Sequence, residues 1–226
     1  MTEHSAEAEN SRYQGRSRTA EQLSRLYLDA VRAADAPGAF RLAAGALAEG
    51  MTIPQLYQEV IAPAMYEIGE LWAKGALTVA DEHLATSLTH RVLAALRPPV
   101  WVEAGMKPEA APSKGRVMLA AVEGEQHVLG LRMAADVLED AGFQTIYLGA
   151  DVPIGALLQA VDALSPDLLG LSATLPELGL QLNQVAAAVR CSHPRLELFV
   201  GGQAASPRQN GGTLVEDLEA LLELSR

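Results

Sequence analysis

The hydrophobic pattern of this chain changes its period once, close to residue 116, and this change limits the fold more than any other feature. Between residues 19 and 97, apolar side chains recur at helical spacing, whereas from residue 116 short apolar runs of strand length alternate with helical stretches. The segment between them is rich in linker residues, among them Pro98, Pro99, Pro108, Pro112, Ser113 and Gly115. We therefore predict a helical domain at 19–97, a linker at 98–115 and an α/β domain at 116–226, preceded by a polar, disordered tail at 1–18.

Four helices with short connections are predicted in the first domain, which indicates a small four-helix bundle. Three of the helix starts carry capping residues, namely Thr19, Thr52 and Thr78. The predicted apolar face of the third helix consists of Leu56, Val60, Ile61, Met65, Ile68 and Trp72. The fourth helix carries Val79, His83, Leu84, Val92, Leu93 and Leu96.

The second domain alternates strands with helices. Strands are predicted at 117–122, 145–148, 168–172, 196–200 and 213–215, and helices at 128–141, 154–164, 178–190 and the C-terminus. Because the strands are almost continuously apolar, they predict a Rossmann-like (flavodoxin-like) domain with a doubly wound, five-stranded parallel sheet. Ligands of such sheets bind at the carboxyl ends of the strands.

Side chains suited to ligand binding follow several of these strand ends. His127 comes just after the first strand, and Glu125 is close enough to accept a hydrogen bond from one ring nitrogen, which would fix the tautomer and favour metal binding by the other. Ser172 and Thr174 lie on the same side of the third strand. The Gly201–Gly202 pair after the fourth strand would let a bulky ligand approach the backbone.

Several classes of function are disfavoured. A net charge of −11 argues against direct binding of nucleic acid through a basic patch. The sequence lacks a phosphate-binding glycine–lysine loop, a Gly-x-Gly-x-x-Gly first turn and a Gly-x-Ser-x-Gly elbow. His127 has no partner at zinc-ligand spacing, and Cys191 is the single cysteine. With neither a signal sequence nor a membrane-length apolar stretch, a soluble, cytoplasmic protein is expected.

The combination Glu125-x-His127-x-x-Gly130, Ser172-x-Thr174 and Gly201–Gly202 resembles the cobalamin (vitamin B12)-binding domain. The resemblance implies that His127 is the lower axial ligand of cobalt. It also implies that the serine, threonine and glycine motifs line the channel for the displaced nucleotide tail. The family more often has aspartate where this chain has Glu125, whose longer side chain still reaches the imidazole.

In the helical domain, Trp72 is followed after nine residues by Glu82 and His83, which resembles the CarH-type photoreceptors. In that subgroup, these residues surround the adenosyl group of adenosylcobalamin. Two departures stand out: the polar segment 1–18 is too short to supply the DNA-binding domain of that subgroup, so none is expected, and Ala73 occupies the position of a histidine that in that subgroup binds cobalt after illumination. His90 is a candidate substitute ligand, seven residues after His83.

The resemblance therefore implies a cobalamin-dependent light sensor or signalling module, not itself an enzyme. It would have light-dependent self-association or a protein partner such as a regulator, and no direct nucleic-acid or membrane contact. The alternative is a corrinoid carrier of a methyltransferase system, with methylcobalamin in place of adenosylcobalamin. A cobalamin-dependent mutase would need a second subunit. Each of these residues also has a purely structural interpretation as the alternative to cofactor binding. Trp72 and His83 could be core residues, Glu82 could interact with the helix dipole, and His127 could be an ordinary loop residue. His4, Cys191 and His193 are expected to play no part in the site.

Overall fold

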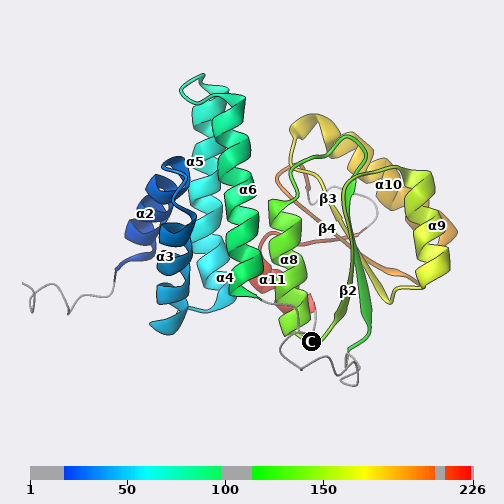
Figure 1. Cartoon of the computed structure of the whole chain (residues 1–226). Coiled ribbons are helices and arrows are strands. Elements are labelled where there is room, and N and C mark those ends of the chain that lie inside the picture. The colour runs from blue at the N-terminus through cyan, green and yellow to red at the C-terminus, as the bar shows by residue number, and fades with distance from the viewer. Residues whose placement is uncertain (1–17, 98–113, 207–211, 225–226) are drawn as a thin grey trace, which may run out of the picture. The chain divides into compact units, whose positions relative to one another are not determined.

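The computed structural model describes residues 18–97, 114–206 and 212–224 (Figure 1). The predicted tail and linker therefore lie almost wholly outside the described residues. The chain divides into two compact units, Met1–Val92 and Leu93–Arg226. No helix among the described residues is long and apolar enough to cross a membrane.

The described residues of the first unit form four helical rods, as predicted. Their elements are α2 (Ala20–Arg32), α3 (Ala36–Ala48), a continuous third rod of α4 (Ile53–Gln55), η1 (Leu56–Ile61) and α5 (Ala62–Ala73), and α6 (Val79–Leu96), whose last four residues fall beyond the end of this unit (Figure 1). Thr19 and Thr52 form reciprocal capping boxes with Gln22 and Gln55, which confirms two of the predicted helix starts. Thr78 exchanges hydrogen bonds with Asp81 and so confirms the third.

The third rod contains a π-helical turn, η1. Here the N–H of Ala62 donates to the carbonyl of Tyr57, five residues earlier. The next residue, Pro63, has no N–H to offer the preceding turn, which favours this local change of register.

The predicted apolar pattern of the third and fourth rods is only partly right. Leu56, Val60, Ile61 and Ile68 are buried, but Trp72 is 47% exposed. On α6, Val79 and Leu84 are exposed, whereas the buried stripe is Ala85, Leu88, Thr89, Val92 and Leu93. Val79 and Leu84 are five residues apart, or about 140° around a helix, so they cannot share one face.

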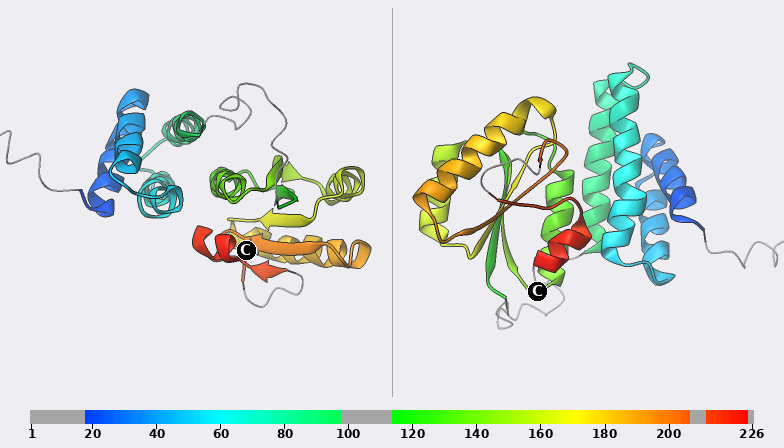
Figure 2. Two further views of the ribbon diagram at one scale, coloured as in Figure 1. Left: turned by 90° about the horizontal axis from the view of Figure 1, so that it is seen from below. Right: turned by 180° about the vertical axis from the view of Figure 1, so that it is seen from behind.

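The second unit is the predicted Rossmann-like domain. Its strands β1 (Arg116–Val122), β2 (Gln144–Val152), β3 (Leu168–Ser172), β4 (Glu197–Gly201) and β5 (Thr213–Leu214) are all parallel, in the order β2-β1-β3-β4-β5. Helices α8 (Leu129–Asp140) and α11 (Leu218–Leu224) pack on one face. The other face is covered by α9 (Ile154–Leu164) and by α10 (Gly179–Ser192), which follows a 3-10 turn, η2 (Pro176–Leu178) (Figure 2).

Strand β2 is longer than predicted, since it continues through Gly149 to Val152. The reason lies in its pairing with β1: Leu119 and Ala120 face Tyr147 and Gly149, and Val122 faces Val152, so β2 carries extra residues at two bulges. Bulges of this kind often lie beside functional sites, because they redirect the strand end.

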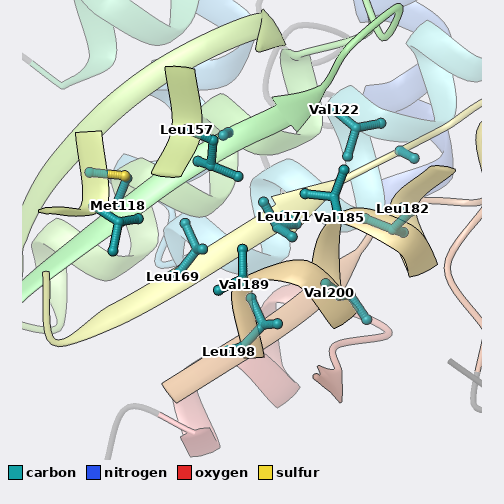
Figure 3. Packing of buried hydrophobic residues seen from close by; sticks show 14 residues of the cluster. Met118, Val122, Leu157, Leu169, Leu171, Leu182, Val185, Val189, Leu198 and Val200 are labelled. Atoms are coloured by element: carbon teal, nitrogen blue, oxygen red, sulfur yellow. The ribbon is translucent and has the colours of Figure 1, made fainter. Parts of the chain in front are cut away.

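The sheet core on the α9 and α10 face is a single cluster of aliphatic side chains (Figure 3). It contains Met118, Val122, Leu157, Leu169, Leu171, Leu182, Val185, Val189, Leu198 and Val200. The opposite face holds Phe199, and its ring fills the space beside Gly170.

We expect Gly170→Ala to destabilise the protein by about 1–3 kcal/mol, because overpacking a filled core costs about this much. A Cβ at Gly170 would lie 2.3 Å from Cζ of Phe199 and 2.6 Å from Cδ2 of Leu119. Urea unfolding measures the effect. The control is Gly155→Ala on α9, where a Cβ would meet no atom within 4 Å; equal stabilities of the two variants would contradict the prediction.

Candidate functional site

The connection from β1 to α8 begins with a tight turn. The N–H of Glu125 donates to the carbonyl of Val122 at 2.9 Å, and Gly124 has φ +84°, as the third position of a type II turn requires. His127 lies in the short segment between this turn and α8, at the carboxyl end of a central strand. This is the edge of the sheet where ligands of such folds bind.

Glu125 orients His127. One carboxylate oxygen of Glu125, Oε1, lies 2.7 Å from Nδ1 of His127 and also accepts the backbone N–H of His127 at 2.6 Å. The carboxylate is fully buried, whereas the imidazole side chain is 51% exposed. Because an ionised carboxylate can only accept a hydrogen bond, it favours the tautomer that has its proton on Nδ1 and leaves a lone pair on Nε2.

The other oxygen of Glu125 ties in the segment after β3. Oε2 accepts the backbone N–H of Thr174 at 2.5 Å and that of Leu175 at 3.3 Å. Burial by itself would raise the pKa of Glu125, but the N–H groups of Thr174 and His127, the imidazole and the N–H of Leu175 together lower it. The carboxylate therefore stays ionised while it joins two strand ends.

Ser172, Thr174, Gly201 and Gly202 meet at the ends of β3 and β4. Ser172 is buried and faces Gly201 in the sheet register, and Thr174 is partly buried. Gly202 has φ +91°, and a Cβ there would lie 2.2 Å from the carbonyl oxygen of Ala173. Gly202 is therefore required for the close packing of these two segments, in addition to any role toward a ligand.

Gly130 is different, because the protein itself does not require a glycine there. It is the second residue of α8, and a Cβ would meet no atom within 4 Å. No other part of the described chain therefore fills the space beside Gly130.

In the helical unit, Glu82 and His83 form a second carboxylate–imidazole pair. Oε2 of Glu82 lies 2.6 Å from Nδ1 of His83, and Thr86 donates its hydroxyl to Oε1 at 2.7 Å. The side chain of His83 is 74% exposed. The exposure of His83 and of Trp72 excludes the interpretation of either as a core residue of the bundle.

Two contributors were missed by the sequence prediction. Thr86 supports Glu82 from one helical turn further on, the spacing at which side chains of a helix meet. Asp151 accepts the N–H of Gly124 at 2.7 Å. The only local signal for Asp151 is an aspartate between glycine and proline after a strand, which is typical of many turns.

The arrangement suits one particular kind of metal binding. Among the described residues, no group of three or more histidine, cysteine or acidic side chains could hold a metal ion. His127 offers one oriented nitrogen, which can fill a single coordination position of a metal whose other ligands come from elsewhere.

Comparisons with known proteins agree with this chemistry. Residues 23–97 and 115–217 match two family models, both described as B12 binding domain. The chain is 36% identical over 157 residues to the HTH-type transcriptional repressor CarH of Myxococcus xanthus, covering 68% of this chain and 48% of that protein. It is 27% identical over 147 residues to trimethylamine corrinoid protein 1 of Methanosarcina mazei, covering 65% and 66%.

The fold is also that of a solved structure. The monomethylamine corrinoid protein of Methanosarcina barkeri matches with a TM-score of 0.71 and 18% identity, over 92% of this chain and 98% of that one. The present chain thus spans about half the length of the CarH repressor and about two thirds of the trimethylamine corrinoid protein.

Proposed function

The chain belongs to the B12-binding domain family, and within that family we propose that it is an adenosylcobalamin-dependent light sensor. The observation that carries the proposal is the exposure of Trp72 and His83 on the bundle, away from its core. The similarity to the CarH repressor of Myxococcus xanthus supports it. In this proposal the protein binds and signals, and does not itself catalyse a reaction.

The residues of the second unit fit the lower side of cobalamin. Because the cofactor brings most of the cobalt ligands itself, one protein nitrogen would be enough, and Nε2 of His127 would supply it. Glu125 holds the imidazole in the required tautomer. Ser172, Thr174, Gly201 and Gly202 are proposed to line the path of the nucleotide tail, with Gly130 leaving room beside His127.

The helical unit is proposed to cover the upper face of the cofactor. Trp72 offers a broad apolar surface for an adenine or ribose group, and the Glu82–His83 pair offers polar atoms at its edge. Bound adenosylcobalamin supplies a cobalt–carbon bond that visible light can break. In this proposal Trp72 would contact the adenosyl group, and the resting arrangement of the bundle would depend on that contact.

The output is proposed to be a change in self-association or in binding to a protein partner, with any effect on transcription passing through that partner. The test is to load the protein with adenosylcobalamin in the dark, and to record the absorption spectrum and the elution volume before and after green light. Both should change. Protein loaded with hydroxocobalamin, which has no cobalt–carbon bond, is the control and should not respond. An unchanged spectrum and size in the adenosylcobalamin sample would contradict the proposal.

A second candidate is a methyl carrier, which the similarity to corrinoid proteins of Methanosarcina favours. A substitution of Trp72 distinguishes the light sensor from the methyl carrier. In a light sensor, Trp72→Ala should weaken adenosylcobalamin binding by about tenfold or more, because the contact of an aromatic ring with the bound adenosyl group contributes about 1 kcal/mol or more. The affinity for methylcobalamin should change less. Calorimetry measures both affinities. Tyr66→Ala, which removes another exposed aromatic side chain of α5, is the matched control. Equal affinities of wild-type and Trp72→Ala protein for adenosylcobalamin would favour the carrier.

Gly130 provides a test of the lower face. We expect Gly130→Ala to leave the apoprotein as stable as before, or slightly more stable, because the added methyl meets no protein atom. Cobalamin affinity should fall by about tenfold, since the methyl would occupy space needed by the cofactor. Gly155→Ala changes the equivalent second residue of α9 and is the matched control. Unchanged affinity in Gly130→Ala would show that the cofactor does not approach this position.

A further inference from the structure

Asp151 has a backbone conformation that is unusual for its residue type. Its φ is +54°, and among the described non-glycine residues only Ala34 and Ser165 share a positive φ. Such a conformation is unfavourable for an L-residue, although aspartate tolerates it better than most. It persists where the surrounding structure holds it, frequently next to a functional site.

The second bulge of β2 produces this conformation. Ala120 and Val122 of β1 face Gly149 and Val152 of β2, so two residues of β2 lie opposite one residue of β1. Asp151 is therefore turned out of the regular strand pattern and reaches the turn at the end of β1.

Asp151 holds that turn through two hydrogen bonds, one from its side chain and one from its backbone. Oδ1 of Asp151 accepts the N–H of Gly124 at 2.7 Å, and the N–H of Asp151 donates to the carbonyl of Glu125 at 2.9 Å. The turn itself is closed by the bond from Glu125 to Val122. Thus the residue whose carboxylate orients His127 has its own backbone fixed by Asp151.

We propose that Asp151 is a positioning residue for the axial ligand His127, acting through the backbone of Gly124 and Glu125. The chain of contacts runs from the Asp151 carboxylate to the turn, from the turn to the Glu125 carboxylate, and from there to Nδ1 of His127. The inference rests on the proposed function, in which His127 binds the cobalt of cobalamin.

Three variants separate the carboxylate from the backbone conformation. Asp151→Gly keeps the positive φ but removes the acceptor for Gly124. Asp151→Asn keeps both an acceptor oxygen and a tolerance of this φ, and so should restore wild-type behaviour. Ser165→Gly is the control for introducing glycine at a positive φ, because Ser165 lies at the C-terminal end of α9, away from the strand ends that carry His127.

The first readout uses the apoprotein. In Asp151→Gly, the amide of Gly124 should exchange with solvent at least about tenfold faster, and the imidazole nitrogen shifts of His127 should move toward those of a mixture of tautomers. Asp151→Asn and Ser165→Gly should match the wild type. Unchanged His127 shifts in Asp151→Gly would overturn the proposal.

The second readout is the affinity for cob(II)alamin, measured by calorimetry. Asp151→Gly should bind about tenfold more weakly, as expected when a group that supports a metal ligand is removed, and Asp151→Asn should restore the affinity. Wild-type affinity in Asp151→Gly would overturn the positioning role. If the wild-type protein itself binds no cobalamin, the proposed function fails, and the apoprotein shifts alone decide whether Asp151 positions His127.

Discussion

Replacing His127 with alanine should give a folded protein that binds cobalamin at least about 100-fold more weakly and without a histidine ligand. The ring is half exposed, and the backbone N–H of residue 127 still bonds to Glu125, so the variant loses little of its own structure. Loss of a metal ligand costs at least as much affinity as loss of the groups that support it, which is about 10- to 100-fold. Calorimetry with cob(II)alamin and thermal unfolding of the apoprotein measure the two effects separately.

His193→Ala is the matched control for this prediction. His193 also pairs with a carboxylate, since its Nε2 lies 2.9 Å from Oδ1 of Asp162. It follows the C-terminal end of α10 and precedes β4, so it lies at the opposite edge of the sheet from His127. Similar losses of affinity in both variants, or none in His127→Ala, would show that His127 is not the ligand.

Glu125→Ala should lower the free energy of unfolding by about 3 kcal/mol, the largest stability effect that we expect in the sheet unit. The substitution removes the acceptor of three backbone N–H groups, those of His127, Thr174 and Leu175, and of the imidazole. Leaving buried donors unsatisfied costs about 1–3 kcal/mol for each group, partly recovered where water can enter. Glu125→Asp should lose less, because the shorter carboxylate can still reach one of the two segments.

Glu123→Ala, in the same turn, is the control for Glu125→Ala, since Glu123 is exposed. Its unfolding in urea should match that of the wild type within about 0.5 kcal/mol. Equal stabilities of Glu125→Ala and Glu123→Ala would mean that the buried carboxylate does not hold the two strand ends together.

Features fixed by short-range bonds could be predicted from the sequence. The caps at Thr19, Thr52 and Thr78 involve partners three residues away, so their signal is complete within one turn of helix. The sheet topology followed from the alternation of strands and helices. By contrast, the extension of β2 to Val152 depends on its pairing with β1, a contact that no local pattern contains.

The site shows the same division. The short spacing of Glu125 and His127 predicted their contact, and the structure confirms it. The second contact of Glu125, to Thr174, joins residues 49 positions apart and was not predicted. The exposure of Trp72 could not be predicted either. Helical spacing shows which residues share a face, but it does not show how far along the helix that face is covered by neighbouring helices.

The most direct test of the central claim, that His127 binds the cobalt of cobalamin, is electron paramagnetic resonance of cob(II)alamin bound to protein labelled with ¹⁵N-histidine. The cofactor's own base contains ¹⁴N, which splits the cobalt lines into triplets, whereas one ligating ¹⁵N nucleus splits them into doublets. We predict doublets in the wild type and their loss in His127→Ala. Triplets in the labelled wild-type protein, or doublets that persist in His127→Ala, would contradict the account.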